Sequence, residues 1–146
     1  MNVFWDTSTI LSVVLNDSRA RTAENLLFET RFRPVTSALV ALEAENRLAA
    51  MRFDNLINAT VSVSLMATLD SIFASRLIPV RNIRDTRLIA AEGCRMIRHF
   101  STARPHKTMD LVHVACARLM KAEAFFTFDS NQSALAEAAG FVVTFS

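Results

Sequence analysis

Four acidic residues, far apart in the sequence, lie at the end of an apolar run or in a helix-like stretch next to one. They are Asp6, Glu43, Asp110 and Asp129. Clustered carboxylates repel one another and stay ionised together only when a cation neutralises them. Hard divalent ions such as Mg²⁺ or Mn²⁺ prefer oxygen ligands, and they activate water and stabilise the leaving oxygen in phosphodiester hydrolysis. If the four acids meet, metal-dependent phosphodiester cleavage is therefore the chemistry that they favour.

Each acid also has a purely structural explanation. Asp6 and Asp129 suit helix N-caps, and Asp129 with Gln132 has the spacing of a capping box. Asp110 in a first turn would favour the helix dipole, and Glu43 could be a surface residue. Singly, these roles are the commoner ones. Together they are less convincing, because all four acids fall where the expected topology places a ligand site.

The elements that must position these acids alternate along the chain. Short apolar runs predict strands at residues 3–5, 34–36, 77–80, 124–128 and 141–145. Helical spacing and N-cap residues predict helices at 7–15, from 17 or 18 onward, and at 38–52, 56–75, 85–100, 108–122 and 130–139, with a loop at 101–107. This alternation indicates an α/β fold with a parallel sheet flanked by helices. In such sheets ligands bind beyond the carboxyl ends of the strands.

Positive charge is concentrated in residues 76–107, which carry a net charge of +6 against +2 for the whole chain. Its bases are Arg76, Arg81, Arg84, Arg87, Arg95, Arg98, Arg104 and Lys107. One interpretation is an ordinary solvated helix face. The other is an RNA-binding belt formed by all of these bases except Arg76, since arginine offers planar paired donors to phosphate oxygens.

Several classes of protein are excluded or disfavoured. Gly93 and Gly140 are the only glycines, so a glycine-rich phosphate loop is impossible. No GxSxG motif is present. The apolar runs are too short to span a membrane, and the N-terminus lacks the features of a signal peptide, so we expect a cytoplasmic protein. Cys94 and Cys116 are expected to be ordinary buried thiols, and His113 is expected to have a packing role.

Four motifs, in order along the chain, resemble those of PIN-domain nucleases. They are Asp6-Thr7-Ser8, the segment from Thr36 to Glu43, the "D-x-x-H-x-A-x-A" segment from Asp110 to Ala117, and Phe126-Thr127-Phe128-Asp129. The resemblance implies one PIN-like domain over residues 1–146, with three layers and a roughly five-stranded parallel sheet.

The resemblance also assigns roles to residues. It implies that Asp6, Glu43, Asp110 and Asp129 are the catalytic acids and hold Mg²⁺ or Mn²⁺. Ser8 and Thr127 become polar neighbours that orient metal or water. The family spacing selects Glu43 over Glu45, and the number of metal ions stays open.

A chain of this size is similar to the VapC toxins of toxin–antitoxin pairs. That similarity implies an endoribonuclease with an RNA substrate, a small VapB-like antitoxin and a toxin homodimer. The apolar stretch 56–73 is a candidate surface for either protein partner, although ordinary core helices would look the same. Two other functions stay open: a non-catalytic RNA- or protein-binding PIN module, and a housekeeping PIN nuclease without an antitoxin.

Overall fold

The protein is built on a five-stranded parallel sheet, as the sequence predicts. The computed structural model describes residues 1–100 and 106–143. The strands are β1 (Asn2–Trp5), β2 (Arg33–Ser37), β3 (Val80–Arg81), β4 (Ala124–Phe126) and β5 (Val142–Val143). They are arranged in the order β3-β2-β1-β4-β5, and every pairing is parallel. The first strand of the chain is therefore at the centre, beside a strand that follows it by about 120 residues.

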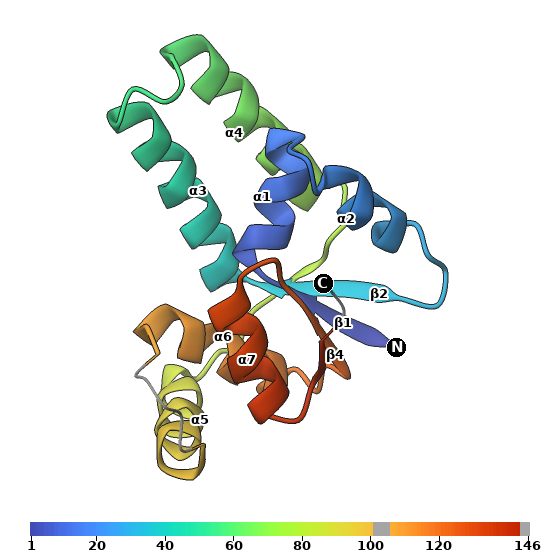
Figure 1. The fold of residues 1–146 in the computed structure, drawn as a ribbon, viewed down its shortest axis with the longest axis vertical. Coiled ribbons are helices and arrows are strands. Elements are labelled where there is room, and N and C mark those ends of the chain that lie inside the picture. Colours follow the sequence, from blue (N-terminus) through green and yellow to red (C-terminus); the bar gives the residue numbers. More distant parts are fainter. Residues whose placement is uncertain (101–105, 144–146) are drawn as a thin grey trace.

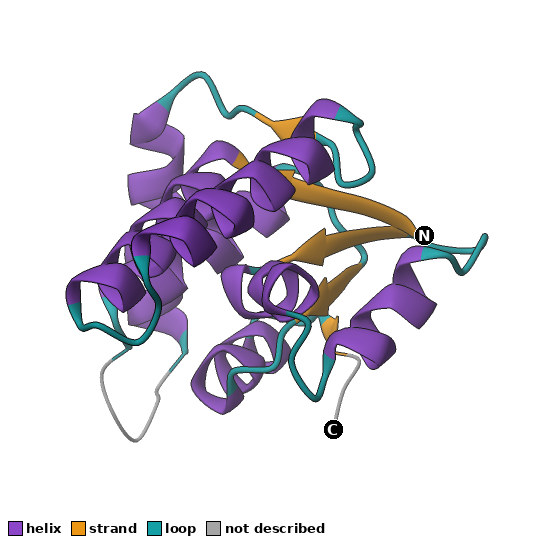
Figure 2. Cartoon of the chain, turned by 90° about the horizontal axis from the view of Figure 1, so that it is seen from above, coloured by secondary structure: helices purple, strands orange, loops and turns teal. Residues whose placement is uncertain are grey.

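Helices cover both sides of this sheet. They are α1 (Thr7–Leu15), α2 (Ala20–Leu27), α3 (Ala38–Phe53), α4 (Ala59–Ala74), α5 (Thr86–His99), α6 (Thr108–Leu119) and α7 (Ser130–Ala138). In Figure 1, α1 to α4 lie above the strands and α5 to α7 lie below them. Figure 2, seen from above, shows the strands of the sheet side by side. The expected three layers are confirmed.

The central strands are short apolar runs without polar alternation, which is typical of strands buried on both faces. Phe4 of β1 stacks on Phe125 of β4, with ring centroids 5.1 Å apart. One residue further on, the Trp5 ring lies tilted against the Phe126 ring, with centroids 5.7 Å apart. These pairs stabilise the register of β1 against β4, and that register brings the residues after the two strands together.

Two helix starts differ from the prediction. Helix α4 begins at Ala59 rather than at residue 56, because Asn58 accepts a hydrogen bond from the Val61 amide, whereas Asp54 ends α3. Helix α2 begins at Ala20 rather than at 17 or 18. The Asp17 carboxylate instead accepts hydrogen bonds from the Ser12 hydroxyl and the Arg19 amide. Both corrections arise because several N-capping residues stand close together in the sequence, and the pattern alone does not choose among them.

The outer strands are shorter than predicted. Strand β3 consists of Val80 and Arg81 only, because Pro79 has no amide hydrogen for the ladder, although its carbonyl oxygen accepts from Thr36. Strand β5 is Val142–Val143, and the rest of the run predicted at 141–145 lies partly outside the described residues. Within the described residues, every helix is too short or too polar to cross a lipid bilayer.

Candidate active site at the carboxyl edge of the sheet

Asp6 ends the central strand β1 and caps helix α1. One of its carboxylate oxygens accepts hydrogen bonds from the Thr9 amide (3.0 Å), the Thr9 hydroxyl (3.0 Å) and the Ser8 hydroxyl (2.8 Å). The other accepts from the Thr127 hydroxyl at 2.6 Å. The side chain is buried, and this burial raises the pKa of the carboxyl although the hydrogen bonds oppose the rise. The capping role and the predicted site role of Asp6 are thus compatible.

Ser8 and Thr127 connect the ends of the two central strands around Asp6. The Ser8 hydroxyl accepts a hydrogen bond from the Phe128 amide at 2.8 Å and lies 3.4 Å from the Thr127 hydroxyl. The Thr127 hydroxyl in turn accepts from the Asp129 amide at 3.0 Å. Both predicted polar neighbours therefore fix the position of Asp6 relative to the segment that carries Asp129.

Glu43 lies on α3 and is held by three side chains. Its Oε2 atom is 2.7 Å from Nε2 of His113 and accepts a hydrogen bond from the Thr7 hydroxyl, while Oε1 is 3.6 Å from the Arg47 guanidinium. These contacts, the His113 hydrogen bond first among them, lower the pKa of Glu43 to about 2 against the effect of burial. Glu43 is therefore a carboxylate at any physiological pH.

His113 does more than pack, contrary to the sequence-based expectation. Its side chain is buried and contacts Glu43 across the space between α6 and α3. Its Nδ1 atom is buried without a hydrogen-bond partner among the described residues. When the neutral ring carries its proton on Nε2, it donates to Glu43, and the atom left without a partner is Nδ1, which is then only an acceptor. This tautomer therefore has the lowest free-energy cost of burial.

Asp110 and Asp129 complete the acidic group. Asp110 is half-buried in the first turn of α6, and its pKa is raised by burial first and then by the negative charge of Asp129. Asp129 is exposed and caps α7 by accepting from the amides of Asn131 and Gln132. Gln132 also donates to the main-chain oxygen of Asp110 at 3.2 Å, which joins α7 to α6. Of the capping box predicted from sequence, only the hydrogen bonds to the Asp129 side chain are formed among the described residues.

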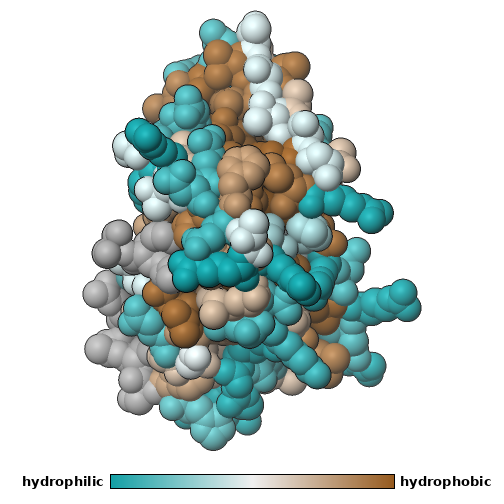
Figure 3. Space-filling model, turned by 90° about the vertical axis from the view of Figure 1, so that its right-hand side faces the viewer, coloured by the Kyte–Doolittle hydropathy of each residue, from teal (hydrophilic) through white to brown (hydrophobic). Residues whose placement is uncertain are grey.

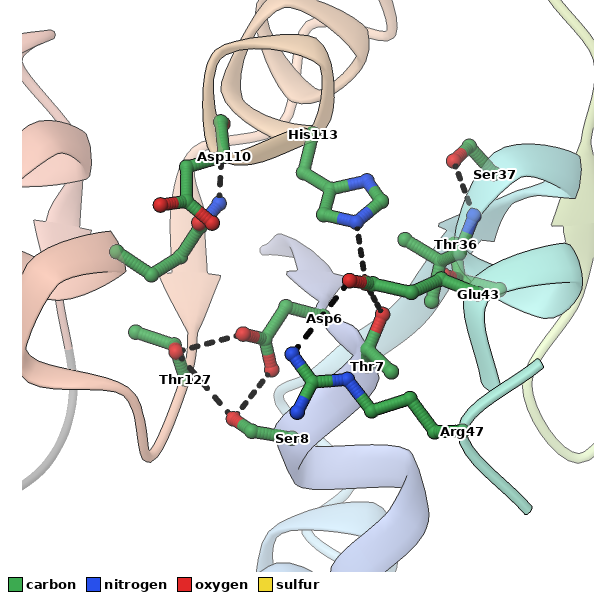
Figure 4. A network of polar contacts seen from close by, with 12 residues as sticks. Asp6, Thr7, Ser8, Thr36, Ser37, Glu43, Arg47, Asp110, His113 and Thr127 are labelled. Carbon is green, nitrogen blue, oxygen red and sulfur yellow. Dashed lines mark hydrogen bonds and ion pairs between the residues drawn. The ribbon is translucent and has the colours of Figure 1, made fainter. Parts of the chain in front are cut away.

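All four predicted acids line one small cavity of about 60 Å³. Its wall also contains Thr7, Ser8, Leu11, Arg47, His113 and Gln132. Figure 4 shows Asp6, Glu43 and Asp110 around this space, with the Arg47 guanidinium extending toward Asp6 and Glu43. Glu45 is exposed and does not line the cavity, in agreement with the choice of Glu43.

The donor set fits a hard divalent ion, but the side chains are not gathered tightly around a single point. Among the described residues, no three or more His, Cys, Asp or Glu side chains are placed closely enough to hold a metal ion. The cavity nevertheless has room for an ion and about one water molecule. Burial first and then the negative charge of Asp129 raise the pKa of Asp110, and a divalent cation would favour its charged form.

The basic segment lies mostly elsewhere. Arg87 pairs with Asp85 and Arg95 pairs with Glu92, so two of its charges are compensated within α5. Lys107 is the member whose charge reaches the cavity, where it lowers the pKa of Asp110. The other described members that were predicted to bind RNA are exposed and do not line the cavity: Arg81, Arg84 and Arg98. Arg104 lies outside the described residues.

Sequence reasoning missed three polar residues of the cavity: Thr7, Arg47 and Gln132. Only Arg47 had a readable signal, since it follows Glu43 by four residues and so shares its helix face. The two thiols differ in exposure. Cys116 is buried as expected, whereas Cys94 is exposed, so the prediction for Cys94 is wrong. Cys94 lines an apolar pocket formed by residues of α3, α5 and α6.

Comparison with known proteins agrees with this architecture. VapC20 from Mycobacterium tuberculosis, a sarcin–ricin loop cleaving toxin, is 24% identical with a TM-score of 0.67, and the match covers 96% of each chain. VapBC2 from Rickettsia felis, bound to a fragment of promoter DNA, is 13% identical with a TM-score of 0.65, covering 99% of this chain and 98% of that one. FitAcB from Neisseria gonorrhoeae is 19% identical with a TM-score of 0.66, covering 97% and 95%.

These structural likenesses establish a shared fold. No curated protein sequence matches the chain. The sequence does match the PIN domain family over residues 3–138, a span that contains all four acids of the cavity. The chain therefore belongs to the PIN domain family.

Proposed function

We propose that the protein is a metal-dependent endoribonuclease, a single PIN nuclease domain that acts in the cytoplasm as the toxin of a type II toxin–antitoxin pair. The observation that carries this proposal is the cavity lined by Asp6, Glu43, Asp110 and Asp129, contributed by four separate parts of the chain. Support comes also from the fold shared with VapC20, a sarcin–ricin loop cleaving toxin.

The four carboxylates would hold Mg²⁺ or Mn²⁺, which when bound supplies an activated water molecule and stabilises negative charge on the scissile phosphate. The protein's own groups prepare this site in advance. Thr127 and Ser8 fix the Asp6 carboxylate, and His113 fixes that of Glu43. Arg47 is more than half exposed and can donate to a phosphate oxygen of the RNA at the rim.

The test is RNA cleavage by purified protein with Mn²⁺, Mg²⁺ or EDTA. We expect metal-dependent cleavage by the wild type, none by Asp6→Asn, and wild-type cleavage by Asp70→Asn, which changes an exposed acid on α4 in the same way. Cleavage that persists in Asp6→Asn at the wild-type rate would refute the proposed site. RNA binding without cleavage under any metal condition would favour the non-catalytic module instead.

The toxin role requires an antitoxin, and the structure has a suitable surface. Helices α3 and α4 form an arm with apolar side chains exposed near its tip, Phe53 (86%), Leu56 (69%) and Val63 (67%) among them. Figure 3 shows apolar surface on the upper part of one face, where this arm lies. A groove of about 680 Å³ between the two helices contains Phe53, Val63 and Met66. Exposed apolar patches of this kind mark sites of protein association.

We propose that a small VapB-like antitoxin covers this arm and that the toxin itself forms a homodimer. Co-expression with a short reading frame beside the gene tests the first part. The neighbouring product should co-purify with the wild type and be lost from the double variant Phe53→Ser/Val63→Ser. If no neighbouring product binds and expression causes no growth arrest, the protein is a housekeeping nuclease. The mass of the free protein in solution, measured by light scattering, tests the dimer.

A further inference from the structure

A second cavity, of about 410 Å³, adjoins the acidic one. The two share Asp129, and Thr127, which binds Asp6, lines the second cavity. Its other walls include Arg19 from the start of α2, Phe128, and Ser133 and Glu137 from α7. An RNA strand with a phosphate beside Asp129 would therefore bring the attached nucleotide to this second cavity. The volume of this cavity is in the range of small-molecule sites.

Arg19 is held in position on one side of this cavity. Its guanidinium lies 4.8 Å from the centre of the Phe128 ring, donates to the Phe128 carbonyl oxygen at 3.4 Å and pairs with Asp17 at 3.5 Å. About half of its side chain remains exposed. A planar guanidinium that is fixed in this way provides a surface on which a nucleobase can stack.

The charges in the cavity favour a base over a phosphate. The carboxylates of Asp129 and Glu137 line its wall, and Asp17 already compensates Arg19. A phosphate group placed there would face like charge. Glu137 accepts a hydrogen bond from the Ser133 hydroxyl at 3.3 Å and retains further acceptor capacity. Its carboxylate is therefore suited to bind N–H donors of a ligand.

We propose that this cavity binds the base next to the scissile phosphate and prefers guanine. Guanine presents two adjacent N–H donors on its Watson–Crick edge, and a carboxylate accepts such a pair with both oxygens. Uracil presents one N–H between two carbonyl oxygens, which a carboxylate repels. This inference rests on the proposed nuclease function for the identity of the ligand, and it adds a determinant of sequence preference, Glu137.

The experiment separates binding from cleavage. The ¹⁵N-labelled protein is titrated in EDTA with 5′-GMP and, separately, with 5′-UMP, and amide shifts give both the dissociation constants and the location. We expect shifts at Arg19, at Phe128 and along α7, and binding of GMP about tenfold tighter than that of UMP, as one charge-assisted hydrogen bond supplies. In Glu137→Gln the preference should fall to about twofold.

Variants of Arg19 test the stacking surface. Arg19→Ala and Arg19→Lys should both weaken the binding of GMP and of UMP by the same factor of about five. The lysine variant keeps the charge but, like the alanine variant, loses the planar group. Arg21→Ala and Glu45→Gln alter exposed side chains outside both cavities and should bind as the wild type does. A GMP preference that survives in Glu137→Gln, shifts confined to other helices, or no binding of either nucleotide would each overturn the inference.

The cleavage assay keeps the two proposals distinguishable. If the nucleotide preference is present but no RNA is cut, the base site stands and the nuclease proposal fails. If RNA is cut in a metal-dependent way with no enrichment of guanine beside the cut, the nuclease proposal stands and this inference fails.

Discussion

Replacing His113 by leucine removes the hydrogen-bond donor from Glu43 while filling much of the same buried volume. A fall in the pKa of Glu43 from 4.5 to about 2 corresponds to roughly 3 kcal/mol in favour of the charged form, shared among its partners. The His113 hydrogen bond is the largest contribution, and a hydrogen bond to a charged group is worth about 1.5–3 kcal/mol. We therefore expect His113→Leu to lose about 2 kcal/mol of unfolding free energy at pH 7.

The pH dependence of that loss is set by the direction of the shift. Glu43 has a lower pKa in the folded protein than in the unfolded chain, so its stabilisation is complete above about pH 4.5 and disappears as the pH falls toward 2. The difference in unfolding free energy between wild type and His113→Leu should accordingly be largest at pH 7 and smaller at pH 3.5.

Urea unfolding at pH 7, 5 and 3.5 measures these differences, and ¹³C titration of the glutamate carboxyl groups measures the Glu43 pKa itself. His113→Gln, which keeps an N–H donor, should recover part of the lost stability. His99→Leu changes an exposed histidine on α5 and should have little effect. A Glu43 pKa that is the same in wild type and His113→Leu would refute the reasoning, as would a stability difference that is independent of pH.

Three further outcomes are expected. Manganese at about ten times its dissociation constant should raise the melting temperature by roughly 4 °C, measured by differential scanning fluorimetry. Asp110→Asn should abolish that gain. Without metal this variant should be more stable than the wild type, because it removes a charge that Asp129 repels. Arg47→Ala should weaken RNA binding, measured by fluorescence anisotropy in EDTA, but lower the unfolding free energy by no more than about 0.5 kcal/mol, because Arg47 is more than half exposed and lies 3.6 Å from Glu43. A thiol reagent at pH 8 should label Cys94 within minutes and Cys116 only after unfolding, because burial raises the pKa of Cys116 to about 11.

The order of the elements and the meeting of the acids could be predicted because they depend on short-range patterns and on one rule of topology. Apolar runs at residues 3–5 and 124–128 are readable as buried strands, although β4 itself ends at Phe126, and the residues after parallel strands lie at one edge of the sheet. Asp6 and Asp129 stand just beyond those runs, so their convergence needed no knowledge of side-chain packing.

Features that depend on contacts between distant helices could not be predicted in this way. The sequence shows that His113 lies one helical turn after Asp110, but not that α6 faces the part of α3 that carries Glu43. The start of α4 was misplaced because Asp54 and Asn58 are both good capping residues. The RNA-binding role of the basic segment stays a prediction, although the spacing of Glu92 and Arg95 already indicated the ion pair that the structure contains.

The central position of β1 has a consequence for the protein during its own synthesis. Asp6 leaves the ribosome about 120 residues before its partners, yet its amide bonds to the Phe126 carbonyl oxygen and its carboxylate to the Thr127 hydroxyl. Until that later segment has emerged and paired with β1, neither the edge of the sheet nor the cavity exists. Until then, a nascent chain carries three of the four acids in an unassembled form. The strand order thus delays assembly of the cavity until nearly all of the described fold has been translated, whereas α3 and α4 are complete much earlier.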